Sequence, residues 1–136
     1  MRISSRAVII ENNKLLTMFR RRKIDDKYVE YFTIPGGGQN DGESLEETVK
    51  RELKEEMNVD ISIIGYLGSA VDAKGEANYF QCKIVSGTPV LSGEELERLS
   101  DANFYKPTFL DLKDIENVTL YGKEFVYKAI NKDYLK

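Results

Sequence analysis

A glycine-rich turn that runs directly into an amphipathic helix constrains the fold of this chain more than any other feature. Three consecutive glycines, 36–38, allow main-chain atoms to approach a ligand or a metal closely. Ser44 and Glu47 have the spacing of a capping box, which predicts a helix over 44–57. Asn58 marks the end of this helix, because Asn accepts the left-handed conformation common just after a helix. The apolar residues of the helix form one narrow stripe: Leu45, Thr48, Val49, Leu53 and Met57.

The rest of the chain predicts strands and one further helix. Apolar runs with strand character cover 3–10, 14–19, 31–34, 59–67, 77–85 and 88–91; a polar stretch at 92–103 leads into 108–112, and helical periodicity covers 122–132. The first two runs are separated by Glu11, Asn12 and Asn13, which predicts a hairpin. A polar, charge-rich segment, 20–30, separates this hairpin from the next strand. The elements lack regular βαβ alternation, so we expect an α/β (α+β) fold in which helices cover a mixed sheet.

Length and charge narrow the function. The 136 residues predict a single domain, 1–136, and 41% hydrophobic residues suffice for one packed core. Twenty basic and 23 acidic side chains give a net charge of -3, which provides no general attraction for polymeric nucleic acid or an anionic membrane. Any anionic partner must therefore be bound locally.

Two scarce residue types exclude further classes of chemistry. The chain contains no histidine, which excludes Ser-His-Asp and Cys-His catalysis and imidazole metal sites. Cys82 is the only cysteine, so no disulfide can form within the chain, and its alternating surroundings predict a buried strand position. No apolar run is long enough to span a membrane, and the run at 7–10 is too short for a signal peptide. We therefore expect a soluble, cytoplasmic protein with no membrane partner.

The predicted helix carries three carboxylates on one face. At about 100° per residue, Glu55 and Glu56 lie about 60° to one side and about 40° to the other side of Glu52. Like charges at these spacings destabilise a helix, and the helix dipole disfavours anions in the last turn. A bound hard cation, Mg²⁺ or Mn²⁺, would compensate, since such ions prefer oxygen ligands. The alternative is a solvated acidic face relieved by neighbouring basic residues, Lys50, Arg51 and Lys54.

The same segment resembles the Nudix box of the Nudix hydrolase family over residues 37–59. The pattern Gly-x5-Glu-x7-Arg-Glu-U-x-Glu-Glu-x-Gly-U, in which U is a large aliphatic residue, is matched by Gly37, Glu43, Arg51, Glu52, Leu53, Glu55, Glu56 and Val59. The final glycine is replaced by Asn58, which is the next best left-handed residue. The preceding residues, 31–36, also resemble the lead-in to the box.

The resemblance implies a mixed β-sheet sandwiched between α-helices. It also implies Mg²⁺- or Mn²⁺-dependent hydrolysis of a nucleoside diphosphate linked to another moiety, which releases a nucleoside monophosphate and a second phosphate-bearing fragment. By position, the metal ligands would be Glu52, Glu55, Glu56 and the main-chain carbonyl of Gly36. Glu52 or a neighbour would also act as general base, and a pair between Arg51 and Glu43 would hold Glu52 in place.

Several residues outside this set are weaker candidates. Arg20 and Arg22 share one face of a strand, so one of them could bind a substrate phosphate; a solvated strand end is the alternative. The resemblance implies one further metal ligand outside the box, from Glu94, Glu95 or Glu97, of which Glu95 is favoured. Asn40 stands where many family members carry an acidic residue.

Other readings of the function stay open from the sequence. A Nudix-fold module could sense a nucleotide without cleaving it, although a complete carboxylate set argues against a pure sensor. A structural interaction protein with an acidic helix would not be stabilised by divalent ions. The substrate could be a nucleotide sugar, ADP-ribose, an oxidised nucleoside triphosphate, a dinucleoside polyphosphate or a non-nucleotide diphosphate. The resemblance also allows a homodimer.

Overall fold

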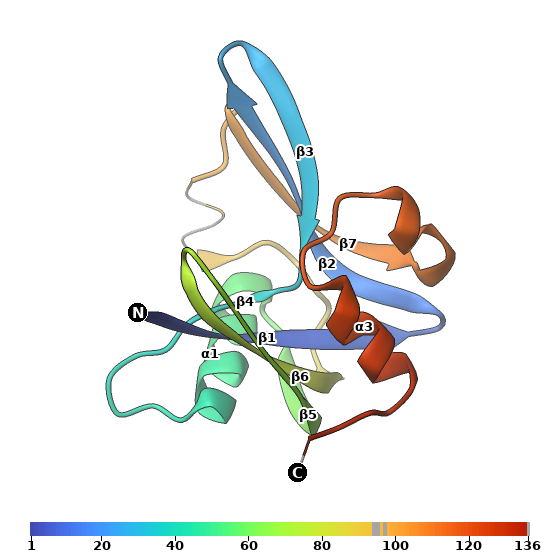
Figure 1. Cartoon of the computed structure of the whole chain (residues 1–136). Coiled ribbons are helices and arrows are strands. Elements are labelled where there is room, and N and C mark those ends of the chain that lie inside the picture. Colours follow the sequence, from blue (N-terminus) through green and yellow to red (C-terminus); the bar gives the residue numbers. More distant parts are fainter. Residues whose placement is uncertain (94–95, 97, 136) are drawn as a thin grey trace.

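A computed structural model describes residues 1–93, 96 and 98–135 of the chain (Figure 1). Its strands are β1 (Arg2–Glu11), β2 (Lys14–Ile24), β3 (Lys27–Thr33), β4 (Gly36–Gly38), β5 (Asp60–Asp72), β6 (Gly75–Ser86) and β7 (Asn103–Asp111). Its helices are α1 (Leu45–Met57) and α3 (Lys123–Ile130), with a 3-10 helix, η1 (Leu112–Asn117).

The strands form a mixed sheet. The central order is β3-β2-β1-β6-β5, with β4 paired to β1 and β7 paired to β2. β1 and β6 run parallel, whereas the remaining described pairs are antiparallel. β4 and β2 pair with different parts of β1, so the glycine strand lies beside the first residues of the chain.

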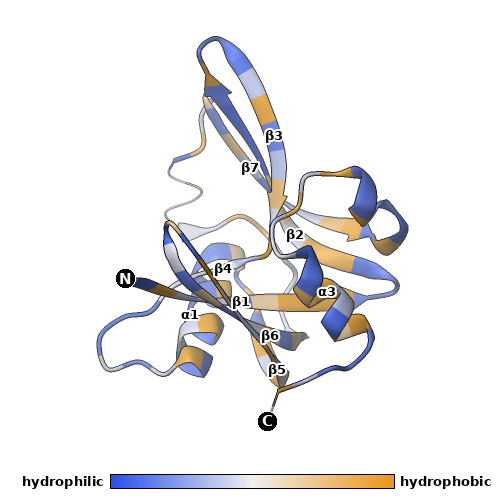
Figure 2. Ribbon diagram, in the orientation of Figure 1, coloured by the Kyte–Doolittle hydropathy of each residue, from blue (hydrophilic) through white to orange (hydrophobic). Residues whose placement is uncertain are grey.

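Helices cover both faces of this sheet. Alternate residues of β1 point to opposite faces, so this one strand contributes to the core on each side. Ala7 and Ile9 pack in the core cluster that contains the apolar stripe of α1. Val8 packs in a second cluster with Phe125 and Val126 of α3. Figure 2 shows β1 as a largely hydrophobic strand between the two helices. The expected sheet sandwiched between helices is therefore confirmed.

Two hairpin turns use residues that tolerate the left-handed conformation. Asn12 and Asn13 have φ values of 51° and 61°, which confirms the hairpin between β1 and β2. Asp25 and Asp26 repeat this geometry, with φ values of 50° and 64°, between β2 and β3. These two strands extend beyond the rest of the molecule in Figure 1. The expectation that 20–30 separates shorter strands was wrong, since most of that segment is strand.

Other predicted elements are confirmed or corrected by the structure. The helix predicted at 122–132 is α3, and Cys82 is a buried residue of β6, 2% exposed. Burial raises the pKa of the Cys82 thiol to about 12. The strand predicted at 88–91 is wrong, since these residues belong to no strand and Val90 donates its backbone N–H to Met57 at the end of α1. Among the described residues, no helix is long and apolar enough to cross a membrane.

Candidate active site

The helix that carries the acidic residues is capped as its sequence predicts. The Ser44 hydroxyl accepts a hydrogen bond from the Glu47 backbone N–H at 3.0 Å, and the Glu47 carboxylate accepts one from the Ser44 N–H at 2.9 Å. Asn58 ends the helix with φ 57° and ψ 41°. Both predicted caps are confirmed, so local signals define both ends of α1.

The last four carbonyl groups of α1 all accept hydrogen bonds, although a helix leaves them without partners of its own. Asn58 donates its N–H to Lys54 at 3.0 Å. The segment after β6 supplies the other donors. Val90 N–H donates to the carbonyl of Met57 at 3.0 Å, Ser92 N–H to that of Glu56 at 3.0 Å, and the Ser92 hydroxyl to that of Glu55 at 2.6 Å. This segment therefore fastens the acidic last turn to the body of the protein.

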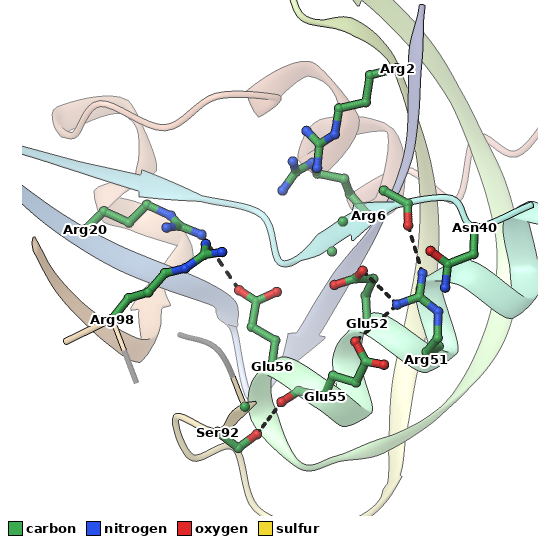
Figure 3. Close-up of a pocket in the computed structure, with 14 residues that line it drawn as sticks. Arg2, Arg6, Arg20, Asn40, Arg51, Glu52, Glu55, Glu56, Ser92 and Arg98 are labelled. Atoms are coloured by element: carbon green, nitrogen blue, oxygen red, sulfur yellow. Dashed lines mark hydrogen bonds and ion pairs between the residues drawn. The ribbon is translucent and has the colours of Figure 1, made fainter. Parts of the chain in front are cut away.

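A polar pocket of about 750 Å³ lies between the start of β1, β4 and the last two turns of α1 (Figure 3). Its described lining residues are Arg2, Arg6, Arg20, Gly36, Gly37, Gly38, Asn40, Arg51, Glu52, Glu55, Glu56, Ser92, Gly93 and Arg98. The structure thus brings together the three predicted carboxylates, Gly36, Arg51 and Arg20. Glu95 lies outside the described residues.

The three carboxylates differ in their exposure to solvent. The Glu56 side chain is 6% exposed, that of Glu52 20%, and that of Glu55 60%. The shallow position of Glu55 follows from its place at the outer edge of the acidic face. Glu56 lies within 3.9 Å of the guanidinium group of Arg20, which also stacks on the ring of Tyr105 at 4.8 Å.

Arg51 connects the carboxylates of α1 to the loop before it. Its Nη1 group donates to Glu52 at 2.9 Å and to Glu55 at 3.1 Å. Its Nε and Nη2 groups donate to the two oxygens of Glu43 at 2.6 and 3.0 Å, and Nη2 also donates to the carbonyl of Gly38 at 2.8 Å. The contact predicted between Arg51 and Glu43 is therefore present, and the same guanidinium group orients Glu52.

Glu43 is held as an anion by this network. The hydrogen bond from Arg51 is the main cause that lowers the pKa of Glu43 to about 2, from an ordinary value of 4.5. The Asn40 backbone N–H and the Thr48 hydroxyl, which both donate to Glu43, lower it further. In turn, Glu43 is the main group that raises the pKa of Arg51.

This lowered pKa predicts how the free energy of unfolding depends on pH. The pKa of Glu43 is lowered in the folded state, so ionised Glu43 increases the free energy of unfolding. This contribution is fully present above pH 4.5 and is lost as the pH falls towards about 2. Urea unfolding followed from pH 7 to pH 2 should show a smaller loss of stability for Glu43→Gln than for the unchanged protein. Equal slopes for the two proteins would contradict this assignment.

The second arginine predicted to bind phosphate lies elsewhere. Arg22 is exposed on the extended part of β2, where it pairs with Val29 of β3 and Asn103 of β7, and it is absent from the described pocket lining. Arg20 occupies the pocket because it is closer to the body of the sheet. Of the two candidates, Arg20 lines the described pocket and Arg22 does not.

The sequence reasoning missed three arginines of the pocket: Arg2, Arg6 and Arg98. Arg2 and Arg6 are an even number of residues apart, so they point to the same side of β1. This spacing was the one sequence signal that could have paired them. Their relation to the glycine turn depends on a distant pairing, in which Arg6 is opposite Gly36. Arg98 belongs to the polar stretch for which no element was predicted.

The donor set suits a hard cation, although the carboxylates are not gathered into a ready site. Within the described part of the chain, no three acidic side chains are arranged to hold a metal ion directly. Glu52 and Glu55 instead hydrogen-bond to Arg51. All three carboxylates nevertheless line one polar pocket beside a strand without side chains, and carboxylate oxygens are the ligands that Mg²⁺ and Mn²⁺ prefer.

Comparisons with known proteins identify the family and the fold. The model of the NUDIX domain family matches residues 1–126. An ADP-ribose pyrophosphatase of Methanocaldococcus jannaschii is 29% identical over 129 residues, which cover 95% of this chain and 70% of that protein. A NUDIX hydrolase from Nitrosomonas europaea has the same fold, with a TM-score of 0.72 at 16% identity over 98% of this chain and 90% of that one. A MutT protein from Methanosarcina mazei Go1 gives a TM-score of 0.68 at 22% identity, over 97% of this chain and 94% of that one.

The family match and the pocket define the class of protein, an enzyme that hydrolyses pyrophosphate linkages. The chain belongs to the NUDIX domain family, and the resemblance seen in the box at 37–59 is confirmed. Hydrolases of this family act on small nucleotide-type substrates and generally use divalent metal ions.

Proposed function

We propose that this enzyme uses Mg²⁺ or Mn²⁺ to hydrolyse the diphosphate linkage of a nucleoside diphosphate joined to a second group. The observation that carries the proposal is the composition of the pocket, in which three carboxylates of one helix lie with five arginines. Carboxylates provide oxygen ligands for divalent cations, and guanidinium groups bind phosphate oxygens. A diphosphate complexed with a divalent cation needs both kinds of group.

The carboxylates of Glu52, Glu55 and Glu56, with the main-chain carbonyl of Gly36, would hold the cation. When bound, it supplies neutralisation of the diphosphate charge and a water molecule of lowered pKa. Arg51 fixes the carboxylate of Glu52 through Oε1, so a proton from the attacking water would be accepted at Oε2. Glu52 thus acts as general base in this proposal.

The remaining charged side chains bind and orient the substrate. Arg20 lies at the buried end of the acidic face, beside Glu56, where its guanidinium group can donate to a phosphate oxygen. Its stacking on Tyr105 limits the orientations that the guanidinium group can adopt. A phosphate bound there would be held close to the carboxylates, as an oriented attack by water requires.

The test is a panel of purified substrates incubated with the protein and Mg²⁺ or Mn²⁺, with the products identified by mass. The panel includes ADP-ribose, because the archaeal relative is an ADP-ribose pyrophosphatase, together with nucleotide sugars, nucleoside triphosphates and dinucleoside polyphosphates. We expect a nucleoside monophosphate and a second phosphate-bearing product, formed by the unchanged protein and lost with Glu56→Gln.

The same panel distinguishes hydrolysis from nucleotide sensing. A single-turnover experiment with excess protein would reveal even slow cleavage, and its absence for every substrate would overturn the proposed activity. A melting temperature that rises with Mg²⁺ or Mn²⁺ in the unchanged protein, and less in Glu56→Gln, would support cation binding independently of turnover.

A further inference from the structure

In the pocket, β4 lies between an acidic half, where the three carboxylates lie together with Arg20, Arg51 and Arg98, and a basic half formed by Arg2 and Arg6. Adjacent residues of a strand point to opposite faces, and here both positions are glycines. A Cβ atom on Gly37 would overlap the Glu52 carboxylate, whereas one on Gly38 would lie 3.4 Å from Nε of Arg2. Since these residues carry no side chains, the pocket is continuous across the strand (Figure 3). An extended anion could therefore contact both halves at once.

Arg2 and Arg6 form the basic half. They are four residues apart on β1 and so point to the same side of it. Figure 3 shows both guanidinium groups directed into the pocket. The two groups are close enough for the charge of Arg2 to contribute to a lowered pKa of Arg6. Two like charges therefore face the same space.

Among the described residues, Arg2 and Arg6 form no direct ion pair with a carboxylate, although Glu56 attracts Arg6 at longer range, and Asp72 and Glu76 line a smaller pocket beside both arginines. The side chain of Arg6 donates a hydrogen bond from Nη1 to the Ile34 carbonyl at 2.9 Å. Burial is the main cause of the lowered pKa of Arg6, so keeping this side chain charged in place costs free energy. A phosphate group would compensate both charges, because guanidinium groups match its geometry.

We propose that Arg2 and Arg6 bind a terminal phosphate of the substrate, which makes the enzyme selective for a nucleoside triphosphate over a diphosphate that ends in a sugar. This inference rests on the proposed function, since it places the linkage to be cleaved over the carboxylates on the other side of β4. A terminal phosphate carries more negative charge than a bridging phosphate. A neutral sugar in the same place would form no ion pair with either guanidinium group.

The lining of the pocket supports recognition of phosphate. Among its described residues no side chain is aromatic or aliphatic, so none offers a surface on which a base or a sugar would stack. Binding in this pocket therefore depends on charge and hydrogen bonds. A substrate with three phosphates makes more of these contacts than one with two.

Binding of inorganic tripolyphosphate tests the phosphate site without turnover. Isothermal titration calorimetry in EDTA would compare the unchanged protein with Arg2→Gln and with Lys14→Gln, which removes the same charge from the distant, exposed start of β2. We expect Arg2→Gln to weaken binding about tenfold, and Lys14→Gln to leave it within about twofold. Arg2 is the better choice because it is exposed, whereas Arg6 also bonds to Ile34 and its loss could disturb folding.

Selectivity is tested by kcat/KM for a nucleoside triphosphate and for ADP-ribose in the presence of Mg²⁺. The unchanged enzyme should prefer the triphosphate by about tenfold, and Arg2→Gln should remove most of that preference. Equal tripolyphosphate binding by Arg2→Gln and Lys14→Gln, or a preference for ADP-ribose, would overturn the inference and leave the proposed activity standing. Arg2-dependent binding without cleavage of any substrate in the panel would overturn the proposed activity while supporting the phosphate site.

Discussion

Glu52→Gln is expected to lower kcat by about 10²- to 10⁴-fold with little change in stability. Glutamine keeps the shape of the side chain and an oxygen that can accept the hydrogen bond from Arg51. It cannot accept a proton from water, and it is a weaker ligand for a divalent cation, so the proposed general base is lost. Because the side chain is partly exposed, the free energy of unfolding should change by about 0.5 kcal/mol. Steady-state kinetics at saturating Mg²⁺ and urea unfolding measure the two effects.

The matched control is Glu46→Gln in the first turn of the same helix. Glu46 is exposed and does not line the pocket, so this variant removes one acidic charge from α1 without touching the site. Its kcat should stay within about twofold of the unchanged enzyme. If Glu52→Gln kept near-normal turnover, or if Glu46→Gln lost as much, the role assigned to Glu52 would be wrong.

Gly37→Ala is expected to lower kcat/KM by about 100-fold while the protein remains folded. The added Cβ would overlap with the Glu52 carboxylate, which must then move. This carboxylate is the far end of a flexible side chain, so the collision can be relieved without moving the backbone. A displacement of about 1 Å in an active site can cost about 100-fold in rate. Kinetics and urea unfolding of the variant would measure both effects.

Gly42→Ala separates this collision from the general cost of replacing a glycine. Gly42 has a φ of 80°, and a Cβ atom there would meet nothing within 4 Å. The left-handed backbone should therefore cost about 1–2 kcal/mol of stability, with kcat/KM retained. Gly37, by contrast, is not among the glycines with positive φ. The explanation would fail if Gly37→Ala were fully active, or if Gly42→Ala lost stability and activity together.

The parts of the fold that the sequence predicts are those with local signals. The capping box at Ser44 and Glu47, and the left-handed Asn58, are read within one turn of the helix that they bound. The hairpin at Asn12 and Asn13 likewise depends on two adjacent residues. These elements can be predicted because they depend on interactions between residues that are close in the sequence.

The extended hairpin of β2 and β3 could not be predicted in this way. Its charged residues give no alternating apolar pattern, and its stability comes from partners far away in the chain. β2 pairs with both β3 and β7, and Arg21 stacks on Tyr28 and Phe104 at 5.2 and 5.0 Å. The methylene groups of a long cationic side chain and its guanidinium plane thus cover apolar rings in a strand that reads as a polar loop.

The same distinction between local signals and tertiary pairing applies to the candidate site. Its acidic half was predictable, since Glu52, Glu55 and Glu56 are placed on one face by the helix period alone. Its basic half depends on tertiary pairing, because Arg2 approaches the glycines only where β4 joins the edge of β1. No pattern within either segment specifies that they will lie side by side.

The hydrogen bonds from Val90 and Ser92 to the end of α1 have a mechanical consequence. Helices ordinarily fray at their ends, and mutual repulsion among three anions would promote unwinding there. Here a loop remote in sequence holds the final turn by three hydrogen bonds, so the carboxylates that we propose to be catalytic are supported even before any cation binds. Lengthening or shortening that loop would consequently disturb catalysis more than its own peripheral location suggests.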